Sequence, residues 1–155
     1  MRRTSRTPWA WISMLAVLLA GCASTPPSSF MTDSEQLTPC SSAPHCVSSQ
    51  AEPGSSKYVE PLAFAGASVD AARQALLKTL YAENNATVER ADERFVHATF
   101  KSTLGFVDDV TFVIRPQDRI IDVKSSSRIG YYDFGVNRKR VATLRVHFEA
   151  QLDRR

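Results

Sequence analysis

Four short apolar stretches separated by turns constrain the fold of this chain more than any other feature. We expect β-strands over residues 87–91, 95–102, 106–115 and 119–128. Side chains alternate between the two faces of a strand, so Val110, Phe112 and Ile114 share one face and Ile121 and Val123 share one face of the next strand. The connecting residues 91–94 and 115–118 are rich in turn formers, which predicts an antiparallel meander.

Two amphipathic helices are expected on either side of these strands. Ser68 can cap the first helix, and Asp70 lies in its first turn, where a negative charge is favoured. Its apolar stripe comprises Val69, Ala72, Leu76, Leu77 and Leu80. The second helix, over residues 136–152, presents Val141, Leu144, Phe148 and Leu152.

This pattern predicts a two-layer α+β domain. We expect a four-stranded antiparallel meander sheet with two amphipathic helices on one face and a more solvated opposite face. Residues 58–64 are apolar but contain Pro61, so they are at best an edge strand or an extended segment.

The first 21 residues have the pattern of a cleaved export signal. Three arginines precede an apolar run over residues 9–20, which is too short to span a bilayer. The run ends in the sequence LAGC, whose last residue is Cys22. This ending resembles the bacterial lipobox, in which small residues admit the signal peptidase and the cysteine thiol takes a diacylglycerol.

Two alternatives to this interpretation remain open. The segment can be an ordinary signal peptide with Cys22 unmodified, although such a site needs no cysteine. Arg2 and Arg3 also suggest twin-arginine export, but the residues that follow fit it poorly, which favours the general secretory route. Ala23 follows the cysteine, whereas Gram-negative lipoproteins kept at the inner membrane tend to have Asp there. We therefore expect a lipid anchor in the outer membrane, with the protein facing the periplasm.

The charge of the chain is mostly a property of its signal. Lys and Arg total 19 and Asp and Glu total 16, but removing the three signal arginines lowers the first number to 16. A mature chain with balanced charge gives no reason to expect nucleic-acid binding.

Residues 22–56 are expected to be a tether. Ser, Thr, Pro and Gly dominate this segment, and it has few large apolar residues to offset the entropy of ordering its backbone. The expected organisation is a signal peptide over residues 1–21, a tether over 22–56 with a cysteine loop at 40–46, and one domain over 57–155.

The two cysteines of that loop most simply form a disulfide. Cys40 and Cys46 lie in the sequence PCSSAPHCVSSQ, and the periplasm is oxidising. The alternative is a metal or redox site that also uses His45. The spacing matches neither the common zinc patterns nor the two-residue spacing of redox motifs. We therefore expect no cofactor and no metal.

Asp108 and Asp109 suggest a pair of carboxylates, but neighbours on a strand point to opposite faces. Asp108 is expected on the core side, where an ionised carboxylate needs a partner. Asp109 is expected outside, opposite Ser126 and diagonal to Lys124 and Arg128. A surface ion-pair cluster and a ligand site are both consistent with this pattern.

The densest set of polar groups lies in residues 125–140, SSSRIGYYDFGVNRKR. Asp133, Gly135 and Asn137 look first like turn and cap residues of the last helix. The functional interpretation is an anion-binding corner at the helix N-terminus, formed with Arg128, Arg138 and Arg140.

A hydrolytic triad has little support in the sequence. Ser125, Ser126 and Ser127 lack the Gly-x-Ser-x-Gly elbow of a nucleophile. His97 and His147 lie within a strand pattern and a helix pattern. The serines are therefore not expected to be catalytic.

Three segments, PCSSAPHCVSSQ, GFVDDVTF and SSSRIGYYDFGVNRKR, in this order and spacing, resemble the domain-of-unknown-function 1499 family of bacterial and some plastid proteins. The resemblance covers about residues 39–150, and His45 stands where members often have Asn. The positions that match the family pattern are Cys40, Cys46, Asp108, Asp109, Arg128, Asp133, Asn137 and Arg138. The family has no assigned reaction, so the resemblance implies the domain and no activity.

Three functions are consistent with these observations. The first is a non-enzymatic binding or interaction domain of the cell envelope, held to the membrane by lipid on Cys22, with an envelope protein or a small anionic ligand as partner. The second is a hydrolase or metal-assisted enzyme, which needs Asp108, Asp133 and either His97 or His45 to converge. The third is a structural or chaperone-like envelope component, recognisable by an exposed apolar patch of roughly several hundred Å².

Overall fold

The computed structural model describes residues 36–154. The predicted export signal, Cys22 and the first part of the predicted tether lie outside the described residues. The elements in chain order are β1 (Cys46–Ser48), β2 (Leu62–Ala63), α1 (Val69–Tyr81), β3 (Ala86–Ala91), β4 (Phe95–Lys101), β5 (Val107–Arg115), β6 (Ile120–Ser127) and α2 (Val136–Asp153).

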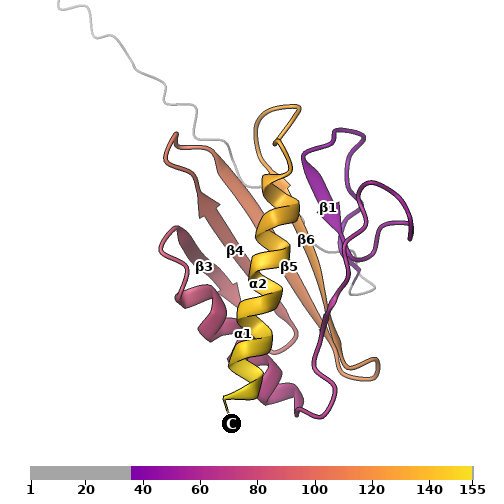
Figure 1. The fold of residues 1–155 in the computed structure, drawn as a ribbon, viewed down its shortest axis with the longest axis vertical. Helices are drawn as coiled ribbons and strands as arrows, with labels where there is room; N and C mark the ends of the chain where they lie inside the picture. Colours follow the sequence, from indigo (N-terminus) through magenta and orange to yellow (C-terminus); the bar gives the residue numbers. More distant parts are fainter. Residues whose placement is uncertain (1–35, 155) are drawn as a thin grey trace, which may run out of the picture.

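The sheet is antiparallel, and both helices pack on one of its faces (Figure 1). Strands β3, β4, β5 and β6 form the predicted meander, and Asp109 lies opposite Ser126 as expected. The α+β prediction is therefore confirmed.

The predicted number of four strands is wrong, because the sheet has six. β1 and β2 both pair with β6, on the side of that strand away from β5. They contain three and two residues, too few to show an alternating pattern in the sequence. Their pairing covers what is otherwise an exposed sheet edge.

The predicted tether boundary at residue 56 is also wrong. Leu37, Cys46 and Val47 are buried, and residues 46–48 are a strand of the sheet. The tether predicted from composition is too long, because its last part is held to the domain by a disulfide, by backbone pairing with β6 and by polar side chains. These interactions need few apolar residues.

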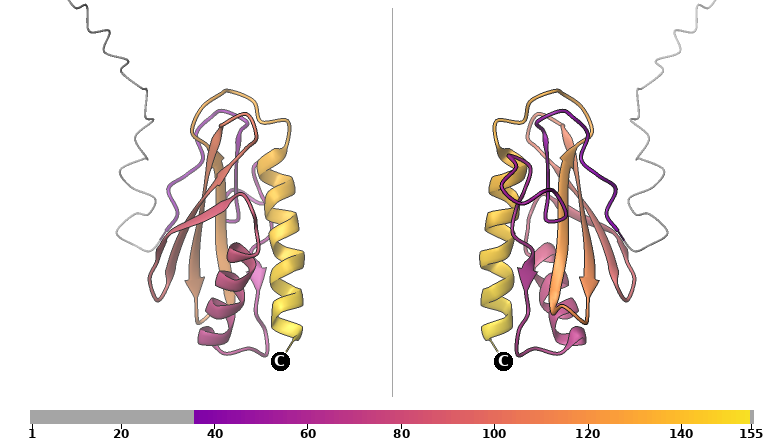
Figure 2. Two further views of the ribbon diagram at one scale, coloured as in Figure 1. Left: turned by 90° about the vertical axis from the view of Figure 1, so that its left-hand side faces the viewer. Right: turned by 90° about the vertical axis from the view of Figure 1, so that its right-hand side faces the viewer.

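The main core lies between the sheet and the two helices, with α2 running along the sheet (Figure 2). The strands contribute Val110, Phe112, Ile114, Ile121 and Val123, and the helices contribute Leu76, Leu80, Val141, Leu144 and Phe148. All ten were expected there from their spacing. Ser68 caps α1 as predicted, because its Oγ accepts a hydrogen bond from the backbone nitrogen of Ala71 (3.2 Å).

The opposite face of the sheet is less solvated than expected. Leu37 packs there against Phe95 and Val113 in a small second apolar cluster. Buried polar side chains, among them Asp109 and Asp122, occupy the rest of this face. The chain segment before β1 therefore acts as a partial second cover for the sheet.

Candidate functional site

Asp109 lies on the outer face of the sheet and is bound by two basic side chains. Arg128 donates two hydrogen bonds to its carboxylate, each 2.8 Å, and Nε2 of His97 donates a third, also 2.8 Å. Asp109 is only 6% exposed, so the predicted ion-pair cluster exists but is buried. Burial raises the pKa of Asp109, but the hydrogen bonds from Arg128 and His97 outweigh it and hold the pKa below its ordinary value of 3.8.

Lys124, the other predicted neighbour of Asp109, contacts the segment before β1 instead. Its Nζ donates to Thr38 Oγ1 at 2.8 Å. Burial lowers the pKa of Lys124, and the charge of Asp109 partly offsets this effect. Lys124 thus fastens residues 38 and 39 to β6.

Asp108 points to the core side, as predicted, and its partner is Arg140 of α2. Arg140 NH2 donates to Asp108 Oδ2 at 2.5 Å, and both side chains are largely buried. The Arg140 guanidinium also lies over the ring of Phe100, 4.8 Å from its centroid. The pair joins α2 to β5.

Asn137 is fully buried and connects this ion pair to the rest of the chain. Its Oδ1 accepts hydrogen bonds from Ser125 Oγ (2.5 Å) and from Arg140 NH1 (2.8 Å). Its Nδ2 donates to the backbone oxygen of His45 (3.0 Å), Ser127 Oγ (3.0 Å) and Asp133 Oδ2 (2.8 Å). One side chain thereby holds α2, β6 and the disulfide loop together.

Asp133 fills the position where the anion-binding corner was expected. Its carboxylate accepts hydrogen bonds from the backbone nitrogens of Gly135 and Asn137, at 3.0 and 2.9 Å. Burial raises the pKa of Asp133, but these hydrogen bonds hold it below its ordinary value of 3.8. The N-terminus of α2 thus already has an anion, which is supplied by the chain itself.

The three arginines of the expected corner point to three different partners. Arg128 binds Asp109 on the outer face, and Arg140 binds Asp108 on the inner face. Arg138 is exposed and donates to the backbone oxygens of Tyr58 (2.8 Å) and Ser56 (2.5 Å). Five of the six predicted ligand-binding residues therefore form two networks on two sides of the sheet, and the sixth, Arg138, binds backbone oxygens elsewhere.

The residue set proposed for an enzyme does not converge when His97 is its histidine. Asp108 lies on the core side of the sheet, whereas His97 lies on the outer face with Asp109. Within residues 36–154 there is no group of three or more His, Cys, Asp or Glu side chains that could hold a metal ion. Cys40 and Cys46 form a disulfide, with their Cα atoms 5.7 Å apart, so their thiols are not available as ligands.

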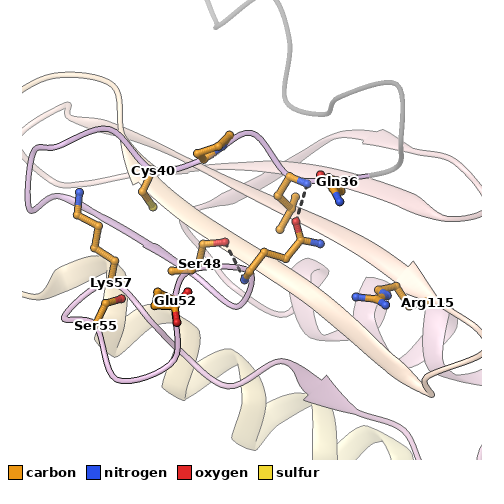
Figure 3. Close-up of a pocket in the computed structure, with 11 residues that line it drawn as sticks. Gln36, Cys40, Ser48, Glu52, Ser55, Lys57 and Arg115 are labelled. Atoms are coloured by element: carbon orange, nitrogen blue, oxygen red, sulfur yellow. Dashed lines mark hydrogen bonds between the residues drawn. The ribbon is translucent and has the colours of Figure 1, made fainter.

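A half-open groove of about 800 Å³ lies on the surface of the described part of the chain (Figure 3). It lies between residues 36–40 and the loop that follows β1. Its lining residues are Gln36, Leu37, Pro39, Cys40, Ser48, Gln50, Ala51, Glu52, Ser55, Lys57 and Arg115. We call it the groove.

Hydrogen bonds fix the walls of the groove. Gln50 accepts from the backbone nitrogen of Leu37 (2.9 Å) and donates to Asp122 (2.6 Å). Lys57 donates to the backbone oxygen of Ser41, which joins the loop to the disulfide segment. Sequence reasoning missed the groove because it assigned both of its walls to the tether. The only sequence signal is that Gln50 ends the PCSSAPHCVSSQ segment.

A second feature that the sequence did not indicate is a set of exposed apolar side chains at one end of the domain. The β4–β5 turn and the β6–α2 loop both lie at the end opposite the C-terminus (Figures 1 and 2). Their exposed large apolar residues are Leu104, Phe106, Ile129, Tyr131, Tyr132 and Phe134. We call these six residues the apolar end. The backbone bond from Arg128 N to Val107 O, 3.0 Å, holds the two loops side by side.

No helix among residues 36–154 has the length and hydropathy needed to cross a bilayer. The search of curated proteins and the search of solved structures found no match to the chain.

One family model matches, that of a protein of unknown function, DUF1499, over residues 36–148. This match begins where the described structure begins, includes the disulfide segment and ends within α2. It covers both walls of the groove, the two polar networks and most of the core. The chain therefore belongs to the DUF1499 family of proteins of unknown function.

Proposed function

We propose that this protein is a lipoprotein of the outer membrane, anchored through Cys22 on the periplasmic face, and that its domain binds a polar ligand in the groove. The lipobox-like sequence and Ala23 support this cellular location. The Cys40–Cys46 disulfide supports an oxidising compartment.

The observation that carries the binding role is the groove itself. Its volume of about 800 Å³ lies within the range of roughly 300–1,000 Å³ that is usual for small-molecule sites. Two segments separated by the disulfide and β1 form its walls, and hydrogen bonds between these segments fix their positions. The groove is thus largely pre-formed, which lowers the entropic cost of binding.

The charges in the groove favour a ligand with both a negative and a positive group. Arg115 is paired with Asp118 and Asp122, so its charge is already balanced. Lys57 and Glu52 also line the groove, and neither forms an ion pair with another described residue. A short peptide has a carboxylate for Lys57, an ammonium group for Glu52 and amides for the polar walls.

The test is a titration with tri-alanine and with tri-alanine amide, followed by the backbone amide signals of the chain. We expect signals of residues 48–57 to shift with tri-alanine. Replacing the carboxylate by an amide, or Lys57→Ala in the protein, should each weaken binding by about tenfold, because each removes the same charge pair. Lys78→Ala, on α1 and outside the groove, is the matched control and should change nothing.

Two results would contradict the proposal. Shifts that cluster outside residues 36–57 would place the ligand elsewhere. Saturable binding that is equally strong for both peptides and for Lys57→Ala would show that no ion pair forms between the ligand carboxylate and Lys57. Ala51→Trp provides an independent check, because an indole at this lining position should block the groove and leave the fold intact.

A metal-assisted or hydrolytic function has less support, because the residues proposed for it lie on different sides of the sheet. The hypothesis of a structural envelope component with an exposed apolar patch is supported by one observation, the apolar end.

A further inference from the structure

The apolar end consists of large side chains that are exposed and do not contribute to the core of the domain. Phe134 is 83% exposed and Tyr131 is 74% exposed. Scattered exposed apolar residues are normal, but here six lie on two loops that a backbone hydrogen bond holds side by side, and a concentration of this kind marks an interaction surface.

The backbone at Phe134 gives a second, independent observation. Phe134 has φ of 53°, in the left-handed region that bulky residues rarely adopt, and Gly135 follows with φ of 77°. Asn or Gly would form this turn at a lower energetic cost. The rings of Phe134 and Tyr132 form a T-shaped pair with their centroids 5.2 Å apart. A strained, exposed aromatic residue is therefore not explained by the stability of the isolated domain.

Three basic residues lie in the elements that adjoin the apolar end, and one of them, Arg138, donates to the backbone oxygens of Tyr58 and Ser56. Lys101 ends β4 beside one loop, and Arg138 and Lys139 lie in the first turn of α2 beside the other. All three side chains are exposed. The nearest carboxylate in these loops is Asp133, which is occupied in capping α2. The two other arginines near this end, Arg128 and Arg140, are neutralised by aspartates, so the remaining charge is positive.

Exposed tyrosine and phenylalanine with basic residues in the adjoining elements match the chemistry of a bilayer surface. Aromatic rings settle at the level of the lipid headgroups, and cations interact with anionic headgroups.

The chain length permits this contact. Gln36 is fourteen steps along the chain from Cys22, and that many steps reach up to roughly 46 Å when extended. Leu37 packs on Val113, near the end of β5 that is far from the apolar end. The distance along β5 from Val113 to Val107 is about 20 Å, well within that reach.

We propose that the apolar end inserts into the headgroup region of the bilayer that holds the lipid anchor, so that the domain has a second membrane contact besides the anchor. The proposal rests on the proposed membrane address. It fixes the orientation of the domain, with the apolar end toward the lipid and the C-terminus of α2 away from it.

A single-tryptophan probe tests the contact. Trp9 and Trp11 are the only tryptophans and both precede Cys22, so a chain of residues 23–155 has none. This chain keeps every strand, both helices and the whole core. Phe134→Trp should move its fluorescence to shorter wavelength when vesicles of phosphatidylethanolamine and phosphatidylglycerol are added. Val146→Trp, an exposed position in the second half of α2, is the matched control and should show no shift.

A second measurement removes the contact. Replacing Tyr131, Tyr132 and Phe134 by serine should reduce co-sedimentation with the same vesicles by about tenfold or more, because apolar burial drives such binding. Val146→Ser should leave co-sedimentation unchanged. The thermal midpoint of the triple variant should stay within a few degrees of the parent, because none of the three side chains belongs to the core.

Other outcomes overturn the proposal. A tryptophan shift that appears without vesicles and grows with protein concentration would show that a second copy of the chain covers the apolar end. No shift with vesicles and no co-sedimentation would show that lipid does not bind there. The groove remains testable in either case, because tri-alanine should bind the triple serine variant as well as it binds the parent.

Discussion

Asn137 joins four parts of the chain through one side-chain amide. It accepts from Ser125 and Arg140 and donates to His45, Ser127 and Asp133. A buried amide with all its hydrogen-bonding capacity used fixes both the helix and the disulfide loop relative to β6. These hydrogen bonds give Asn137 a structural role within residues 125–140, one of the segments that resemble the family.

Asn137→Ala should lower the free energy of unfolding by about 2–4 kcal/mol, because it leaves several buried polar groups without partners. Chemical denaturation of the parent and the variant measures this difference. Asn84→Ala, at an exposed position after α1, should cost no more than about 0.5 kcal/mol. A loss equal to that of the control would show that the Asn137 hydrogen bonds contribute little.

Asp109 makes the stability of the domain depend on pH. Its pKa is lower in the folded protein than the ordinary value of 3.8. Its contribution is therefore fully present above about pH 4 and is lost as the pH falls through the lower folded value. Protonation of Asp109 removes the negative charge that faces Arg128, to which Asp109 is joined by two hydrogen bonds of 2.8 Å.

Asp109→Asn should cost about 2–4 kcal/mol of unfolding free energy at pH 7, since it breaks the buried ion pair between Asp109 and Arg128. The difference between parent and variant should shrink below about pH 4, where the parent also loses the charge. Urea unfolding across a pH series measures it. A gap that stays constant down to the lowest pH would mean that the charge of Asp109 is not what stabilises the fold.

The segment before β1 acts as an element of the fold although it has no regular structure. Leu37 closes a small cluster with Phe95 and Val113, and Lys124 binds Thr38. This segment and the loop after β1 also form the two walls of the groove. Loss of its packing should therefore affect both stability and ligand binding.

Leu37→Ala should lower the unfolding free energy by about 2 kcal/mol, at the lower end of the range for buried leucines, because its cluster is small. Leu104→Ala removes the same atoms from a side chain that is 83% exposed and should change stability by no more than about 0.5 kcal/mol. Thermal melts of the two variants compare them directly. Equal midpoints would mean that residues 36–40 are not part of the folded domain.

At the scale of the whole molecule, periodicity predicted the meander, both helices and the register that sets Asp109 opposite Ser126. It did not predict β1 and β2, which are too short to show a period. The burial of residues 36–48 depends on a disulfide and on hydrogen bonds to β6, which composition does not reveal. The candidate site was predicted as one corner, but strand parity and the fold separated Arg128 from Arg138 and Arg140.

The apolar end and the groove were not predictable for a related reason. Each is made by loops that are distant in sequence and adjacent only after the sheet has formed. In the sequence, Tyr131, Tyr132 and Phe134 look like any apolar residues near a helix start. Their exposure follows from the turn at residues 133–135, which directs the chain back into α2.

The measurement that tests the central claim most directly is the mass of the N-terminal peptide of the protein purified from a membrane fraction. The account predicts a chain that begins at Cys22 and carries lipid acyl groups, and a Cys22→Ser variant that keeps its signal and loses the lipid. A chain that begins at Met1, or a cleaved chain without lipid in the soluble fraction, would contradict the lipoprotein assignment and the membrane contact proposed for the apolar end.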